Sequence, residues 1–280
     1  MTGIIDVGGG MRGAYTAGLY DYLLDHHIAP EYCLGVSAGA ANLASYLAGQ
    51  RGRNHRFYMR YAARKEYMSF SNLVRTGSYV DLDYVYDVLS GAGGEDPLDY
   101  DAFAANPAPY VVVATDARTG QARYFTRADL PRDHYDPIKA SCCLPMACRP
   151  YPVNGRPYFD GGIADPVPYQ KALEDGCDRV LVLLTRPRDF VRPPLKYTKV
   201  MAAAMRAYPK AWEALQHRHE VYNRQVAQVK ALEAQGRALL LAPADIEGMS
   251  TLRHNEFAME RLYGYGYQDG RKAAAFLAAG

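Results

Sequence analysis

Short apolar runs alternate with amphipathic segments along most of the chain. Five runs predict strands, at residues 3–7, 33–36, 110–114, 179–184 and 238–242. Continuous apolar runs such as residues 110–114 are typical of strands that helices cover on both faces of a parallel sheet. The segments between them predict helices, over residues 14–25, 38–48, 81–89, 137–141, 168–175, 197–235 (broken near Pro209) and 256–277. The pattern therefore predicts an α/β fold with a mostly parallel central sheet.

The second apolar run ends in two glycines around a serine, Gly35-Val-Ser-Ala-Gly39. A strand that passes directly into a helix at Gly-x-Ser-x-Gly is typical of a nucleophile elbow, which holds the serine hydroxyl at a sharp turn. Gly35 and Gly39 lack the Cβ atoms that would collide where strand and helix cross. Because such pentapeptides also occur by chance, this segment alone fits a simple turn as well as a catalytic Ser37.

The first predicted strand runs into a glycine-rich segment, Gly8-Gly-Gly-Met-Arg-Gly13. Its spacing matches a dinucleotide-binding fingerprint, but the second strand ends in Val36 and Ser37 instead of an acidic residue that would hold a ribose. A P-loop is not indicated either, because no Gly-Lys-Ser/Thr follows. Exposed N–H groups at a helix start still attract negative charge. Since parallel strands bring both segments to one sheet edge, we expect this loop to form an oxyanion hole beside Ser37.

A third segment, Asp160-Gly-Gly162, follows a short predicted strand at residues 156–159. Asp-Gly is first of all a turn signature. A hydrolase serine also needs a base, and an aspartate beside two glycines could approach it closely. The ordinary aspartate pKa of about 3.9 makes a poor base for a hydroxyl unless burial raises it. Asp160 is thus either a turn residue or the base.

Four segments in this order resemble the blocks of the patatin-like phospholipases, with spacings typical of the compact bacterial members. They are Gly8-Gly-Gly-Met-Arg-Gly13, Gly35-Val-Ser-Ala-Gly39, Ala140-Ser-Cys-Cys-Leu-Pro145 and Asp160-Gly-Gly162. The match covers residues 3 to about 184, roughly two thirds of the chain. The resemblance implies a three-layer α/β/α fold. It also implies a catalytic dyad without histidine, in which Ser37 is the nucleophile and Asp160 the base.

The same resemblance implies the other site residues and the reaction. Gly8, Gly9 and Gly10 would form the oxyanion loop, and the N–H of Ala38 is a further candidate donor. Arg12 would brace that loop or bind a substrate phosphate. The activity implied is cleavage of fatty-acyl esters of (lyso)phospholipids or related lipids, without a metal or cofactor.

Two alternatives stay open. An α/β-hydrolase esterase with a Ser-Asp-His triad would need a late histidine, for which His217, His219 and His254 are available. We prefer the dyad for two reasons. An α/β-hydrolase reaches its nucleophile only after several strands, whereas Ser37 already follows the second strand. The three histidines also lie in basic or polar segments, which favours exposure to solvent. The second alternative is a catalytically inactive module that uses the same loop to bind lipids or other anions.

Composition excludes several classes of protein and site. A formal net charge of +2 gives no case for a nucleic-acid partner. Five cysteines without regular spacing argue against a disulfide framework and for a reducing compartment, and no cluster suggests a metal site. No signal peptide is visible, and no run approaches the roughly 20 apolar residues of a membrane span. We expect a cytoplasmic protein that can lie peripherally at the inner face of the membrane.

Basic residues gather in two places. Residues 51–65 hold six Arg and Lys residues and no Asp or Glu. The first interpretation is a helix face exposed to solvent. The alternative is a patch that binds anionic lipid headgroups. Residues 186–230 hold ten Arg and Lys residues against three acids, which fits either a helical appendage or a lid that contacts a membrane. Because no linker or repeat divides the chain, we expect a single domain over residues 1–280. Its catalytic core would span about 3–184 and its basic helical part about 186–280.

Overall fold

The structure, a computed structural model, describes residues 1–279. Its centre is an eight-stranded sheet with the order β5-β6-β3-β2-β1-β7-β8, in which β4 also pairs with β3. The strands are β1 (Thr2–Asp6), β2 (Tyr32–Val36), β3 (Tyr110–Asp116), β4 (Ala122–Thr126), β5 (Tyr151–Val153), β6 (Arg156–Asp160), β7 (Arg179–Leu183) and β8 (Ala238–Leu241). The five strands predicted from apolar runs pair in parallel, and β4, β5 and β6 are antiparallel. The predicted α/β class with a mostly parallel sheet is confirmed.

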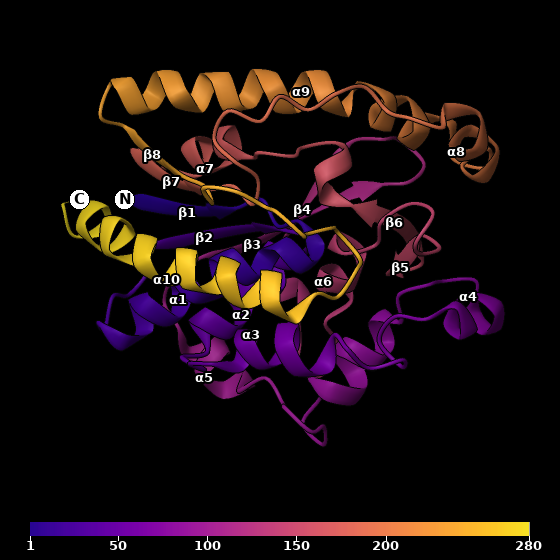
Figure 1. Cartoon of the computed structure of the whole chain (residues 1–280), viewed down its shortest axis with the longest axis horizontal. Coiled ribbons are helices and arrows are strands. Elements are labelled where there is room, and N and C mark those ends of the chain that lie inside the picture. Colours follow the sequence, from indigo (N-terminus) through magenta and orange to yellow (C-terminus); the bar gives the residue numbers. More distant parts are fainter. Residues whose placement is uncertain (280) are drawn as a thin grey trace.

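Helices cover both faces of this sheet and make three layers (Figure 1). The helices are α1 (Ala14–Asp25), α2 (Ala38–Leu47), α3 (Arg53–Arg56), α4 (Phe70–Thr76), α5 (Tyr100–Ala105), α6 (Asp136–Ser141), α7 (Tyr169–Glu174), α8 (Thr198–Ala204), α9 (Pro209–Ala234) and α10 (Glu256–Ala278). Alternate strand residues face opposite layers, as the pleat requires. Ile4 packs in a cluster with α1 and α2, whereas Ile5 packs in one with α7 and α9.

Shorter helical turns complete the chain. Three are 3-10 turns, η1 (Gly10–Gly13), η4 (Arg127–Asp129) and η5 (Gly161–Ile163). Two are π-helical, η2 (Phe57–Tyr61) and η3 (Tyr84–Leu89), and η3 forms most of the helix predicted over residues 81–89. The sequence interpretation did not include α4, α5 or β5. The missed β5–β6 hairpin had a signal, because its turn is Asn154-Gly155, and both residues adopt positive φ angles of 50° and 74°.

The C-terminal part is built into the sheet and both layers. β8 extends the sheet next to β7, and α9 and α10 lie on opposite faces of it (Figure 1). The predicted break at Pro209 is confirmed, because this proline is the first residue of α9, where its missing N–H costs no hydrogen bond. The rear half of α9 packs on the sheet through Val226 and Val229, while its first half extends over the carboxyl ends of the strands.

Most of the basic run at residues 51–65 is neutralised by acids from elsewhere in the chain. Arg53 and Arg56 pair with Asp96, and Arg60 and Arg64 pair with Glu95. Arg51 pairs with Asp25. These ion pairs leave little free positive charge for lipid headgroups, so the structure does not favour the headgroup alternative for this segment. Across residues 1–279, no helix is both long and apolar enough to cross a membrane.

Candidate active site

Ser37 forms the sharp turn between β2 and α2 that its pentapeptide predicts. Its backbone has φ 56° and ψ −134°, a strained conformation for a residue with a side chain. A Cβ atom on Gly35 would lie 2.4 Å from the Cα of Ala40, and one on Gly39 would lie 2.5 Å from the carbonyl oxygen of Asp6. Both glycines are therefore required by close backbone contacts. The strain holds the serine side chain at the carboxyl edge of the sheet.

Hydrogen bonds with the segment at residues 140–145 hold this turn in place. The N–H of Ser37 donates a hydrogen bond to the hydroxyl of Ser141 (2.7 Å), and this hydroxyl donates to the carbonyl of Val113 (2.6 Å). Two residues further on, the carbonyl of Cys143 accepts a hydrogen bond from the N–H of Asp160 (2.8 Å). The segment at residues 140–145 thus ties the serine turn and the aspartate strand to the same sheet edge.

Sheet register brings Asp160 close to Ser37. Val36, just before the serine, pairs with Val113 on β3, and the next residue of β3, Ala114, pairs with Asp160 on β6. Asp160 is 2% exposed, and its Oδ1 accepts a hydrogen bond from the N–H of Gly162 (2.8 Å). Burial raises the pKa of Asp160, and hydrogen bonding with the Ser37 side chain is among the influences that oppose this rise. The structure thus brings the two predicted side chains together.

The glycine loop meets the serine turn through backbone contacts. Gly8, Gly9 and Gly10 adopt φ angles of 65°, 142° and 59°, all in the region that glycine favours. A Cβ atom on Gly8 would lie 2.1 Å from the carbonyl oxygen of Val36 and 3.1 Å from the nitrogen of Ala38. Only glycine permits this approach of loop and turn.

The backbone N–H groups of the glycine loop differ in their hydrogen bonding. That of Gly8 donates to Asp6 Oδ1 (2.9 Å), and burial raises the pKa of this carboxyl to about 6. The expectation that all three glycines donate to an oxyanion is therefore corrected for Gly8, which anchors the loop. The N–H groups of Gly9, Gly10 and Ala38 make no hydrogen bond within residues 1–279. Gly9 and Gly10 line one cavity together with Ser37, and Ala38 directly follows the serine.

Ser37 lies where two cavities meet. Both cavities are lined by Gly10, Ser37, Leu144 and Leu252. The first, called here the apolar cavity, has about 90 Å³ of open space among side chains such as Ala41, Tyr58, Val85 and Ile138. The second, called here the cationic cavity, has about 490 Å³ and is lined by Asp160 and by four arginines: Arg12, Arg186, Arg192 and Arg218.

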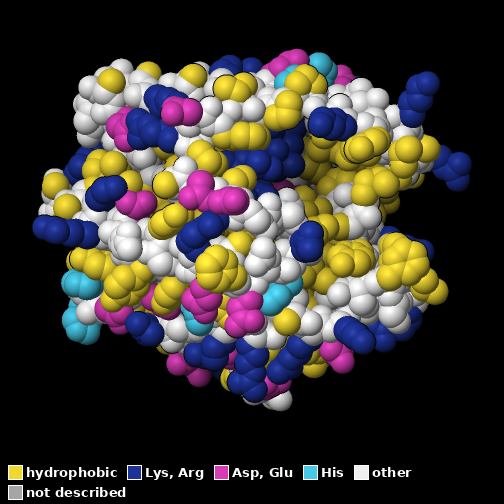
Figure 2. All heavy atoms as spheres, viewed as in Figure 1, with side chains coloured by type: hydrophobic (Ala, Val, Ile, Leu, Met, Phe, Trp, Pro, Cys, Tyr) yellow, Lys and Arg dark blue, Asp and Glu magenta, His cyan; other side chains and the backbone are white. Residues whose placement is uncertain are grey.

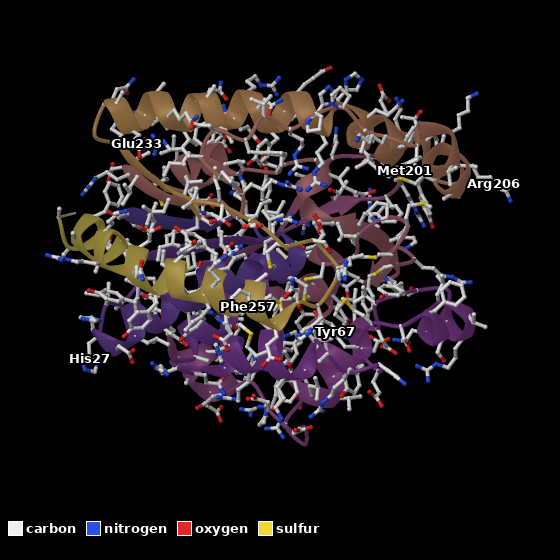
Figure 3. All side chains as sticks on the ribbon, viewed as in Figure 1. His27, Tyr67, Met201, Arg206, Glu233 and Phe257 are labelled. Atoms are coloured by element: carbon white, nitrogen blue, oxygen red, sulfur yellow. The ribbon has the colours of Figure 1, made fainter. Side chains whose placement is uncertain are left out.

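The cationic cavity opens between the first half of α9 and the strand ends below it. Figure 2 shows dark blue basic side chains gathered in this hollow and yellow apolar side chains beside it. Met201 on α8, which lines the cavity, and Tyr67, which lines the apolar cavity, lie above and below the sheet edge (Figure 3). The opening is thus bordered by segments that are far apart in the sequence.

Comparison with known proteins agrees with this geometry. A family model described as patatin-like phospholipase matches residues 7–173. The chain belongs to the patatin-like phospholipase family. A second family model, a domain of unknown function (DUF6363), matches residues 208–278, which include the whole of α9 and α10. The patatin-like part therefore supplies Ser37, Asp160 and the glycine loop, and the second segment covers them.

Two relatives described as uncharacterized match parts of the chain. The chain is 30% identical over 195 residues to the uncharacterized protein YjjU of Escherichia coli, a match that covers 67% of this chain and 52% of that protein. A shorter match, 42% identical over 62 residues, is to an uncharacterized NTE family protein of Mycobacterium tuberculosis and covers 22% of this chain and 16% of that protein. The chain thus matches only about half the length of YjjU. VipD from Legionella pneumophila has a similar structure, at 13% identity and a TM-score of 0.49 over 99% of this chain and 67% of that one.

The side chain of Arg12 is held by a contact with the loop before α10. Its Nη1 donates to the hydroxyl of Thr251 (2.9 Å), and its side chain is buried. The carbonyl of Thr251 also accepts a hydrogen bond from the N–H of Met11 (3.0 Å), so the loop before α10 holds the glycine loop in place. Both predicted roles for Arg12, bracing and anion binding, are compatible with this position.

Sequence reasoning missed Arg186, Arg192 and Arg218 as site residues. They belong to the basic segment at residues 186–230, for which the sequence leaves open a helical appendage or a lid that shields the acyl pocket, without indicating which arginines enter the site. The segment shows features of both alternatives, because α9 packs on the core and its first half also lines the cavity through Leu215 and Arg218. In the part of the chain that the structure describes, no group of three or more His, Cys, Asp and Glu side chains could hold a metal ion.

Proposed function

We propose that the protein is a serine acyl hydrolase that cleaves fatty-acyl esters of (lyso)phospholipids or related lipids. The observation that carries this proposal is the meeting of Ser37 with the buried carboxyl of Asp160 at the junction of an apolar and a cationic cavity. The residues with unpaired amides, Gly9, Gly10 and Ala38, line these cavities together with Ser37. A serine, a base and amide donors are the minimum set for acyl transfer.

In the first step, Asp160 takes the proton of the Ser37 hydroxyl as its oxygen attacks the acyl carbonyl. The carbonyl oxygen becomes an oxyanion, and the N–H groups of Gly9, Gly10 and Ala38, which have no partner within residues 1–279, stabilise it. The C–O bond to the leaving alcohol then breaks, and this alcohol takes the proton from Asp160. The fatty acyl group remains as an ester of Ser37.

In the second step, water replaces the alcohol. Asp160 accepts a proton from this water as it attacks the acyl-serine carbonyl, and the same amides stabilise the second oxyanion. Collapse of the intermediate returns the proton to Ser37 and releases the fatty acid. The apolar cavity would hold the acyl chain in both steps, because its walls are mostly hydrophobic.

The surroundings of Ser37 favour this dyad over a triad. Within residues 1–279, no histidine lines either cavity. His217 pairs with Glu220 along α9 (3.2 Å), and Nδ1 of His219 lies 2.9 Å from the carbonyl of Gln216. His254 lies in a different, shallower pocket. A base next to Ser37 is therefore supplied by Asp160.

The proposed function is tested by offering three esters with the same acyl chain: a diacyl phospholipid, its lyso form and a triacylglycerol. We expect release of fatty acid from at least one of the two phospholipids, measured by mass spectrometry of the products. Failure to release fatty acid from all three esters, by protein shown to be folded by circular dichroism, would contradict the proposal.

The pH dependence of hydrolysis follows from the surroundings of Asp160. The carboxylate form is the base, so activity falls as pH drops through the pKa of Asp160. Burial raises this pKa, and the positive charge of Arg218 is the largest influence that lowers it. We therefore expect the acid limb of kcat/KM to lie above that of an ordinary aspartate at about pH 3.9. Arg218→Gln should move the limb to higher pH; an unchanged or lower limb in this variant would contradict the assignment.

We further propose that the mouth of the cationic cavity contacts a lipid bilayer. Leu73 on α4 and Met201 on α8 line this cavity, and the same two helices carry the exposed apolar side chains Phe70, Val74 and Val200. Exposed basic residues follow on α8 and the loop before it, including Lys196 and Lys199. This combination is typical of peripheral attachment to anionic lipids. Phe70→Ser with Val200→Ser should weaken cosedimentation with phosphatidylglycerol vesicles; equal cosedimentation would contradict this contact.

A further inference from the structure

The four arginines of the cationic cavity come from three distant parts of the chain. Arg12 lies in η1, Arg186 and Arg192 follow β7, and Arg218 projects from α9. The patatin-like match ends at residue 173, so three of the four lie beyond it. α9 brings Arg218 close to the aspartate: a Cβ atom on Gly162 would lie 2.8 Å from Nη2 of Arg218 and 3.1 Å from Oδ1 of Asp160.

These guanidinium groups lack partners in the protein. Among residues 1–279, none of the four forms an ion pair, and their buried Nε atoms find no hydrogen-bond acceptor. Arg12 donates one hydrogen bond, to the hydroxyl of Thr251, and two of the other three lie over aromatic rings. Arg186 lies 4.3 Å from the ring centroid of Phe190, and Arg192 lies 4.5 Å from that of Tyr222. Their N–H donors are therefore left for a ligand.

Positive charge is concentrated here with little compensation, because four arginines face one carboxyl group. Burial, followed by the nearby arginines, lowers the pKa of Arg12 and of Arg192 to about 9. Burial also lowers the pKa of Arg186 and Arg218. The cavity lining contains a single carboxyl group, that of Asp160. Buried unpaired charges destabilise a fold unless a counter-charge offsets them, so the arrangement indicates an anion of more than one charge.

The position of the cluster relative to Ser37 identifies which end of a substrate it meets. Because the apolar and cationic cavities share Ser37, an ester whose acyl chain fills the first must direct its alcohol part into the second. Guanidinium groups bind phosphate oxygens through paired hydrogen bonds. A quaternary ammonium on the same headgroup would meet the same positive field and be repelled.

We infer that Arg12, Arg186, Arg192 and Arg218 form a subsite for a phosphate-bearing anionic headgroup, and that the enzyme prefers acyl esters with such a headgroup over zwitterionic or uncharged ones. This inference rests on the proposed ester hydrolysis. It also gives the C-terminal segment at residues 208–278 a role, because this segment supplies Arg218, the ring of Tyr222 and the Thr251 that holds Arg12.

The preference is tested with three lipids that share one acyl chain: 1-acylglycerol 3-phosphate, 1-acylglycerophosphocholine and 1-acylglycerol. We expect kcat/KM for the first to exceed that for the other two by about tenfold or more, the usual range for charge-assisted hydrogen bonds. Equal kcat/KM for the three lipids would overturn the inference while leaving the proposed hydrolysis intact. Hydrolysis of none of them would count against the proposed function instead.

Two variants test whether the arginines of the cationic cavity cause the preference for the phosphate ester. Arg186→Gln and Arg192→Gln should each reduce the ratio of kcat/KM for the phosphate ester to that for 1-acylglycerol by about tenfold, mainly through KM. Arg224→Gln is the matched control, because Arg224 is on α9 and exposed; its ratio should stay within twofold of the unmodified protein. An unchanged ratio in both cluster variants would overturn the inference.

A binding measurement, which requires no turnover, distinguishes a site for a lipid headgroup from a site for inorganic phosphate. The Ser37→Ala protein is titrated by calorimetry with inorganic phosphate, glycerol 3-phosphate and 1-acylglycerol 3-phosphate. We expect affinity to rise in that order and to fall about tenfold or more for the acylated ligand in Ser37→Ala/Arg192→Gln. Inorganic phosphate binding as tightly as the acylated ligand would overturn the headgroup assignment, and so would the absence of binding by all three ligands in folded protein.

Discussion

Replacing Ser37 by alanine, or Asp160 by asparagine, is expected to lower kcat for ester hydrolysis by about 10⁴-fold or more. The first change removes the nucleophile. The second keeps the shape of the side chain, and its carbonyl oxygen can still accept the hydrogen bond from the N–H of Gly162, but an amide cannot take the proton of the serine. The measurement is initial-rate hydrolysis of a short-chain ester.

Asp101→Asn is the control for the aspartate change, because Asp101 is 84% exposed and, among residues 1–279, its one ion pair is with Arg132 at the surface. It should hydrolyse the ester at the unmodified rate. Both site variants should retain the unmodified circular dichroism spectrum. Activity within tenfold of the unmodified protein in either Ser37→Ala or Asp160→Asn would refute the dyad.

The second large effect is expected at the glycine loop. In Gly8→Ala, the new Cβ atom would lie 2.1 Å from the carbonyl oxygen of Val36, which is backbone and cannot move without displacing the serine turn. The amides of Gly9 and Gly10 would move with the loop, and loss of one oxyanion donor alone typically lowers kcat by about 10²–10³-fold. We therefore expect kcat to fall by at least about 100-fold.

Gly49→Ala separates this steric effect from backbone strain. Gly49 has a similar φ angle of 68°, but a Cβ atom there would meet nothing within 4 Å. This variant should lose about 1 kcal/mol of unfolding free energy, the usual cost of a left-handed conformation for a residue with a side chain, and should keep full activity. If Gly8→Ala behaved like Gly49→Ala in both measurements, the close contact of loop and turn would not matter for function.

Much of this architecture could be predicted because local sequence determines it directly. The short apolar runs at residues 110–114 and 179–184 are typical of strands of a covered sheet, and they form β3 and β7. The two glycines around Ser37 correspond to two backbone contacts too close for any Cβ. Once β1 and β2 pair in parallel, the glycine loop and the serine turn must share an edge.

What could not be predicted depends on contacts between distant residues. Asp160 lies near the serine because it pairs with Ala114 where β6 joins β3. No local sequence pattern specifies that pairing. The hydrogen bond from the Gly8 amide to Asp6 involves a carboxyl that lies, in the sequence, within the predicted strand at residues 3–7. Likewise, the charge of residues 186–230 is visible in the sequence, but its position over Ser37 requires the path of α9.

The central claim is that Ser37 is a nucleophile activated by Asp160, and fluorophosphonate labelling followed by peptide mass spectrometry tests it most directly. A fluorophosphonate reacts with a serine that can attack its phosphorus, and the reaction needs no assumption about the lipid substrate. We predict a single modified peptide carrying the label on Ser37, and labelling at least about 100-fold slower in Asp160→Asn. Folded protein in which Ser37 stays unmodified, or in which Asp160→Asn labels at the unmodified rate, would contradict the account.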